Sequence, residues 1–297
     1  MSFQPGTRPG IRLRLSAMSE TAVVTDSTAY LPDELVEENG IGLVRLQVIV
    51  AGRSYQEGTE IHPAQVAEAL REWKVITTSR PTPAEFLTAY TAAAEAGATG
   101  VVSVHLSAHM SGTYESAMLA ARESPIPVRV IDSGSVGMGL GFVALAAARS
   151  ARNGDALAEV VEVAERVSAG ATVLFYVDTL EFLRRGGRIG GASAALGTAL
   201  RVKPLLQLVN GEVAPLEKAR TASRALARLQ ELVLEKAAGR QVDVAVQHLA
   251  SEDRARSLAA DLSGRLSGTK IGVSEVGAVV GAHVGPGMVC VCVAPKP

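Results

Sequence analysis

The stretch VVSVHLSAHMSGTYESAMLAA, residues 101–121, indicates the fold class because it predicts a buried strand that turns directly into a helix. The strand half is rich in β-branched apolar residues, which is typical of a parallel sheet covered on both faces. Four hydroxyl side chains gather at the bend, on Ser107, Ser111, Thr113 and Ser116. They either cap the new helix or, with its first backbone amides, hold an anion. The stretch alone leaves both interpretations open.

The sequence on either side predicts a two-domain α/β protein. Strands alternate with amphipathic helices over residues 21–167, which favours a Rossmann-like N-terminal domain with a parallel sheet and helices on both faces. Residues 168–297 contain paired apolar runs, with a hairpin signal at Asn210 and Gly211, and predict an α+β domain with a mostly antiparallel sheet. Residues 1–20 lack the apolar run of a signal peptide and are interpreted as a disordered leader.

The longest charge-free run extends from Val276 to Ala294 and approaches the length of a membrane span. Glycines interrupt it, so we expect two paired strands, 271–277 and 287–295, joined by a glycine turn, and no stable membrane insertion. The two cysteines, Cys290 and Cys292, are expected to point to opposite faces of the second strand.

Composition narrows the function classes. The 297 residues are 47% hydrophobic, which is enough for a large core. Lys and Arg number 29 against 30 for Asp and Glu, so no basic field favours nucleic acid. The two cysteines have neither metal-ligand spacing nor a disulfide framework, which suits the reducing cytoplasm. We therefore expect a cytoplasmic globular protein without a metal.

Motifs for phosphate binding and hydrolysis are weak. No P-loop pattern occurs, and the glycines of VGMGLGF, residues 136–142, depart from the dinucleotide fingerprint and equally suit close helix packing. Ser111 lies in HMSGT rather than in G-x-S-x-G, and no H-E-x-x-H motif is present.

Polar residues nevertheless gather where strands and turns are predicted to end. TTSRPTP contains Thr78 and Ser79, SAHMSGTYES contains Ser111, IDSGSVGMGLG adds hydroxyls and glycines, and GAHVGPG contains His283. Each hydroxyl taken singly suits a helix cap. Taken together at the carboxyl ends of parallel strands, where α/β sheets bind ligands, they suit a carboxylate or a phosphate.

From about Thr21 to Ala294 the chain resembles the DegV family of bacterial fatty-acid-binding proteins. The resemblance rests on motifs in the family's order: VVTDSTAYLP, TTSRPTPAEF, SAHMSGTYESA, VIDSGSVGMGLG, LEFLRRGGRIGG, KPLL through NGEVAPLEKART, and GAVVGAHVGPG. One residue departs from it, since Arg80 stands where the family usually has glutamine.

The resemblance implies a long-chain fatty acid buried between the two domains. Its carboxylate is then held by Thr78 and Ser111, and His283 lies nearby, where its proton offsets charge; a turn histidine bonded to backbone is the alternative for His283. The residues expected to line the pocket are Ser79, Gly112 and Gly137.

The resemblance also implies a non-catalytic carrier without a cofactor. Such a carrier presents the fatty acid carboxylate to a separate fatty acid kinase, whose catalytic subunit forms acyl phosphate for phospholipid synthesis. Arg188 and Arg220 are then expected to dock the kinase, whereas Arg184 and Arg185 are expected to face a helix C-terminus. The alternative is a serine-dependent hydrolase or transferase that acts on a small acyl or phosphorylated metabolite through Ser111 and His283.

Overall fold

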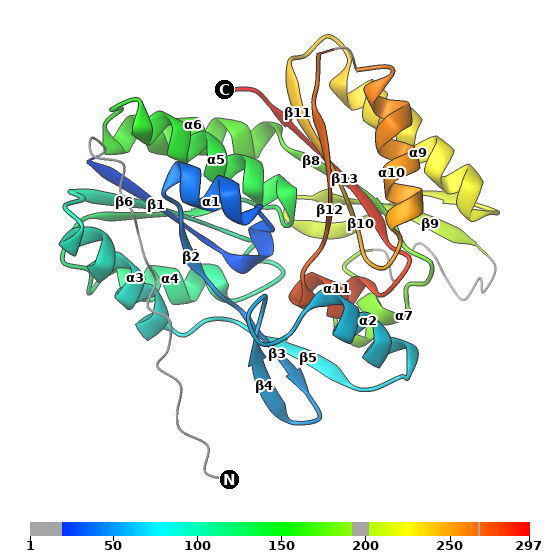
Figure 1. Cartoon of the computed structure of the whole chain (residues 1–297), viewed down its shortest axis with the longest axis horizontal. Coiled ribbons are helices and arrows are strands. Elements are labelled where there is room, and N and C mark those ends of the chain that lie inside the picture. The colour runs from blue at the N-terminus through cyan, green and yellow to red at the C-terminus, as the bar shows by residue number, and fades with distance from the viewer. Residues whose placement is uncertain (1–19, 192–201, 267) are drawn as a thin grey trace.

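The computed structural model describes residues 20–191, 202–266 and 268–297, and it contains three sheets (Figure 1). Of the predicted leader, residues 1–20, only residue 20 belongs to the described part. Among the described residues, no helix combines the length and the apolar character that crossing a bilayer requires.

The first sheet is parallel and has the strand order β2-β1-β6-β7. Helices α3 and α4 pack on one face, and α5 and α6 pack on the other, so the predicted Rossmann-like arrangement is confirmed (Figure 1). Helix α1 packs on α5, and a short 3-10 helix follows β1. The bounds are β1 Thr21–Asp26, β2 Gly42–Val44, β6 Gly100–His105, β7 Val128–Asp132, α1 Asp33–Asn39, α3 Pro83–Glu95, α4 Thr113–Ala121, α5 Met138–Arg152 and α6 Leu157–Gly170.

The second sheet has six strands in the order β10-β9-β8-β13-β11-β12, and every pair except β11 with β12 is antiparallel. The predicted mostly antiparallel sheet is therefore confirmed. Helices α9 and α10 cover one face, while α5 and α6 contact β13. The bounds are β8 Thr172–Tyr176, β9 Lys203–Val209, β10 Glu212–Ala219, β11 Val242–His248, β12 Ile271–Glu275, β13 Val289–Pro295, α9 Ala222–Ala237 and α10 Glu252–Ser263.

The third sheet is small, antiparallel and ordered β4-β3-β5. The sequence did not predict strand β5, because its polar residues next to Pro81 resemble a loop. Pairing with β3 overrides that local signal: Thr78 lies opposite Val48. The short helices α2 and α11 pack beside this sheet, and α7 packs on α11. The bounds are β3 Gln47–Val50, β4 Arg53–Gln56, β5 Ile76–Ser79, α2 Pro63–Arg71, α7 Glu181–Arg185 and α11 Ala278–Val284.

The charge-free run near the C-terminus was predicted wrongly. Helix α11 stands in place of the expected glycine turn, and β12 and β13 do not pair, because both lie against β11. The side chains of Cys290 and Cys292 share a face, with their Sγ atoms 3.8 Å apart. The expectation of opposite faces was wrong because side chains in a strand alternate, so residues two apart point the same way.

Both predicted domains contribute to one apolar core. A cluster of buried side chains continues from Val104 in β6 through Leu140 in α5 to Val173 in β8. The domain boundary predicted after residue 167 falls near the end of α6, and it stays a prediction.

Candidate functional site

A cavity of about 360 Å³ lies where the three sheets meet. The six-stranded sheet supplies apolar side chains to its wall, including Val173, Phe175 and Leu208. Helix α11 adds Val280 and α7 adds Leu183. The polar lining comes from β5, from the loops that follow the parallel strands β6 and β7, and from Arg188, Gln247 and His283. The cavity thus combines a long apolar wall with a limited set of polar groups, as small-molecule sites do.

The structure brings almost all of the predicted site residues to this cavity. Its lining includes Thr78, Ser79, Ser111, Gly112, Gly137, Arg188 and His283. Arg80, the residue that departs from the family motif, lines it as well. Arg220 does not: it is exposed and lies between β10 and α9. Residues 78, 111 and 283 come from three separate parts of the chain.

Thr78 and His283 are hydrogen-bonded, with 2.9 Å between Oγ1 and Nε2. The pairing of β5 with β3 fixes the backbone of Thr78, and α11 carries His283. The other ring nitrogen, Nδ1, is buried without a hydrogen-bond partner and faces Gly186, where an added Cβ would lie 2.2 Å from it.

The imidazole of His283 carries no positive charge near neutral pH. Burial and, to a lesser degree, the nearby positive charge of Arg188 together lower the pKa of His283 to about 4. A neutral ring can donate or accept one hydrogen bond at Nε2, depending on its tautomer. His283 therefore acts at this end of the cavity as a polar group rather than as a cation.

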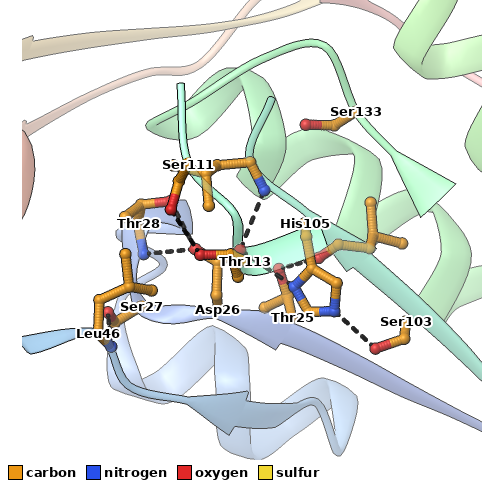
Figure 2. A network of polar contacts seen from close by, with 12 residues as sticks. Thr25, Asp26, Ser27, Thr28, Leu46, Ser103, His105, Ser111, Thr113 and Ser133 are labelled. Carbon is orange, nitrogen blue, oxygen red and sulfur yellow. Dashed lines mark hydrogen bonds and ion pairs between the residues drawn. The ribbon is translucent and has the colours of Figure 1, made fainter. Parts of the chain in front are cut away.

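Ser111 lies just before helix α4 and does not cap it. The N-cap residue is Gly112, and no side chain caps the helix there. The Ser111 hydroxyl instead pairs with the hydroxyl of Thr113, with 2.9 Å between the oxygens (Figure 2). Ser107 has a different role, because its hydroxyl donates to the carbonyl of Gly211, a residue 104 positions later in the chain, at 2.7 Å. Of the hydroxyls at this bend, that of Ser111 lines the cavity.

A buried polar network lies behind this bend, and sequence reasoning missed it (Figure 2). The Asp26 carboxylate accepts hydrogen bonds from the backbone N–H groups of Thr28 and Leu106, each at 3.0 Å. It also lies 3.1 Å from Nδ1 of His105. Asp26 and His105 are fully buried. The network joins the carboxyl ends of β1 and β6, and so supports the cavity wall at Leu106.

His105 continues this network to Ser103, with 2.7 Å between Nε2 and Oγ. The order of serine, histidine and aspartate resembles a catalytic triad. However, Ser103 is fully buried and its hydroxyl also bonds Tyr90 at 2.9 Å. A nucleophile must reach its substrate, so this buried serine is a structural residue and not a nucleophile. The one available sequence signal was the pair of polar residues inside an otherwise apolar strand.

The arginines of the site lie at different places. An added Cβ on Gly112 would lie 1.9 Å from Nη1 of Arg80, so the Arg80 guanidinium covers Gly112. Arg188 donates to the carbonyls of Met110 and Gly186, at 3.1 and 2.7 Å. Its bond to Met110 links the loop after α7 to the loop after β6.

Arg184 and Arg185 lie in the last turn of α7, as expected, and both pair with Glu181. The guanidinium of Arg185 also lies over the ring of Trp73, 4.6 Å from its centre. Within the described residues, no group of three or more histidines, cysteines or carboxylates is placed to hold a metal ion.

Comparison with known proteins adds an independent line of information. The family model described as "Uncharacterised protein, DegV family" matches residues 20–296. A DegV domain-containing protein of Streptomyces coelicolor is 54% identical over 276 residues, which cover 93% of this chain and 98% of the relative.

Solved structures are similar over the same extent. A DegV family protein from Thermus thermophilus, reported for its fatty acid binding, has a TM-score of 0.88 at 36% identity and covers 93% of this chain and 99% of its own. DegV from Bacillus subtilis, described as a fatty acid binding protein, has a TM-score of 0.87 at 34% identity, with 94% and 100% coverage.

Proposed function

Because the chain belongs to the DegV family, we propose that it binds a long-chain fatty acid in the cavity, with the carboxylate beside Thr78 and Ser111. The observation that carries the proposal is the composition of the cavity wall. Hydroxyls from two distant segments line the same cavity, and the six-stranded sheet supplies an apolar surface to it. Fatty acid binding by the related proteins from Thermus thermophilus and Bacillus subtilis supports the same ligand class.

The acyl chain supplies most of the binding free energy in this proposal. About 14 buried methylenes at ~0.8 kcal/mol each give on the order of 11 kcal/mol of gross transfer free energy. The carboxylate loses its hydration on entering the cavity, and hydroxyl and amide donors have to offset that cost. The polar end therefore fixes the orientation of the lipid, with its carboxylate held where a partner can reach it.

We infer that the chain is a carrier rather than an enzyme and needs no cofactor. A serine hydrolase would require a base beside its nucleophile. The hydroxyl of Ser111 is bonded to Thr113, and Nε2 of His283 is bonded to Thr78. Catalysis by this pair would need Ser111 to be bonded to His283, and each of the two residues is bonded to a threonine instead.

The proposal extends to a separate fatty acid kinase as partner. In this role the carrier holds the acyl chain, and the kinase transfers phosphate to the exposed carboxylate to form acyl phosphate for phospholipid synthesis. Nucleoside triphosphate for this step is drawn from the cytoplasm, so the proposal places both proteins there. Arg188 and Arg220 are both exposed, so both are accessible for contact with a partner.

Denaturing mass spectrometry of the purified full chain tests lipid binding. We expect one long-chain fatty acid to co-purify in near-stoichiometric amount, and delipidated protein to take up added fatty acid. A protein that carries no lipid, binds none when it is offered, and hydrolyses model esters would replace the carrier with the hydrolase.

A further inference from the structure

Two guanidinium groups lie on the cavity wall, and neither has an acidic partner in the part of the chain that the structure describes. Arg188 donates to two backbone carbonyls, and Arg80 covers Gly112. The remaining polar lining residues are Thr78, Ser79, Ser111, Gln247 and His283, and no aspartate or glutamate is among the described lining residues. The wall of the cavity therefore carries two positive charges.

A carboxylate head group balances only one of these charges. A phosphate monoester carries close to two negative charges above its second pKa of about 6, and offers three terminal oxygens. Arginine matches such a group well, because its planar fork donates two parallel hydrogen bonds to phosphate oxygens. The net charge of the wall thus favours a dianionic head group over a monoanionic one.

Each arginine lies beside residues of the polar lining. Arg80 covers the backbone of Gly112, directly beside Ser111 and at the N-terminus of α4. Arg188 lies close enough to His283 for its charge to disfavour protonation of that ring, and His283 is bonded to Thr78. The two charges therefore flank the hydroxyls of Thr78 and Ser111, which also donate to anions.

We propose that the cavity binds a single-chain lipid with a dianionic phosphate monoester head more tightly than the same lipid with a monoanionic head, and that Arg80 sets this preference. The proposal rests on the proposed function, because the acyl chain occupies the same apolar wall. It adds a specificity that comes from this chain's own residue, since a glutamine at position 80 would carry no charge.

Three probes that each contain 16 carbon atoms separate the effect of head-group charge from that of head-group shape. Palmitic acid tests lipid binding itself, while hexadecyl phosphate and hexadecyl sulfate have tetrahedral heads that differ by one charge at pH 8. Affinities are measured on the delipidated full chain by displacement of a fluorescent fatty acid, below the concentrations at which the probes form micelles. We expect hexadecyl phosphate to bind about tenfold more tightly than hexadecyl sulfate, which corresponds to about 1.4 kcal/mol.

Variants assign the preference to its residue. In Arg80→Gln we expect the ratio of phosphate to sulfate affinity to fall to near unity while palmitic acid still binds. Gly112→Ala should lower the ratio as well, because the added Cβ overlaps Nη1 of Arg80 and displaces the guanidinium. The matched control is Arg122→Gln, an exposed arginine at the far end of α4, which should leave the ratio unchanged.

The outcomes separate the two proposals. If wild-type protein binds none of the three probes, lipid binding itself fails. If palmitic acid binds but the phosphate and sulfate bind equally, the preference for a dianion is overturned and lipid binding stands. A ratio that persists in Arg80→Gln protein of normal palmitic acid affinity overturns the role of Arg80.

Discussion

At the scale of single residues, the hydroxyls of Thr78 and Ser111 are the groups that the carboxylate is proposed to meet. A hydrogen bond to a charged group contributes roughly 1.5–3 kcal/mol. We therefore expect Thr78→Val or Ser111→Ala to weaken fatty acid binding by about one to two decades, measured by displacement of a fluorescent fatty acid. Thr88→Val is the control, because that hydroxyl bonds a helix carbonyl on the exposed face of α3.

Thermal unfolding of the same variants separates binding from stability. We expect melting temperatures close to that of the wild type. If both variants bind fatty acid normally and only melt earlier, the hydroxyls are structural and the carboxylate lies elsewhere.

His283 makes a prediction about pH. Its pKa is about 4 in the folded protein, below the ordinary value of 6.5, because burial disfavours the charged ring. The unfolded chain therefore binds a proton first as pH falls, and folding stability is lost between about pH 6.5 and pH 4. In urea unfolding at several pH values, we expect His283→Gln to reduce this loss. The exposed His109→Gln is the control, and equal slopes for wild type and His283→Gln would contradict the assignment.

The residues of the site were predictable where local sequence carries the signal. Thr78, Ser111 and His283 lie in motifs that resemble a known family, and Ser111 follows a recognisable buried strand. Asp26 was not predictable as a support of the site. Its hydrogen bonds reach residues 79 and 80 positions away, and a single sequence contains no record of such pairings.

At the scale of elements, helix α11 is the clearest case in which distant contacts, rather than the local sequence, decide the secondary structure. Locally, residues 276–294 favour strands, since valines and glycines are poor helix formers. The helix is held from elsewhere: the Glu57 carboxylate accepts from the backbone N–H of Val279 at 2.7 Å, and the Tyr30 hydroxyl accepts from that of Val280 at 3.0 Å. These caps come from residues more than 200 positions earlier, so tertiary contact decides the element.

Removing one of these caps should loosen α11. Glu57→Ala leaves the buried N–H of Val279 without an acceptor, at a cost of about 1–3 kcal/mol. We expect a lower free energy of unfolding and weaker fatty acid binding, because α11 supplies Val280 and His283 to the cavity. Urea unfolding and the displacement assay measure the two effects. Glu123→Ala, an exposed residue after α4, should change neither. Normal binding in Glu57→Ala would show that α11 holds its place without this cap.

At the scale of the whole molecule, the architecture places the polar site between units that are separate in sequence. The three-stranded sheet supplies Thr78, the loop after a parallel strand supplies Ser111, and α11 supplies His283. Alternation of strands and helices predicted the parallel sheet correctly, and the hairpin at Asn210 predicted part of the antiparallel one. The third sheet escaped prediction because β5 gains its strand conformation only by pairing with β3.

The proposed presentation of the lipid to a kinase would depend on the outer surface, and Arg220 provides its cleanest test. Arg188 lines the cavity, so its replacement would alter both lipid and partner. Arg220 is exposed and outside the lining, so Arg220→Glu should keep the co-purified fatty acid and the wild-type melting temperature. Phosphorylation of the bound lipid by the fatty acid kinase should nevertheless fall by about tenfold or more, because a like-charge contact in an interface costs several kcal/mol.

The control is Arg122→Glu, which makes the same change of charge on the surface beyond α4; its bound lipid should be phosphorylated normally. Phosphorylation of Arg220→Glu at the wild-type rate would remove this arginine from the docking surface, whereas loss of its lipid would place it in contact with the ligand.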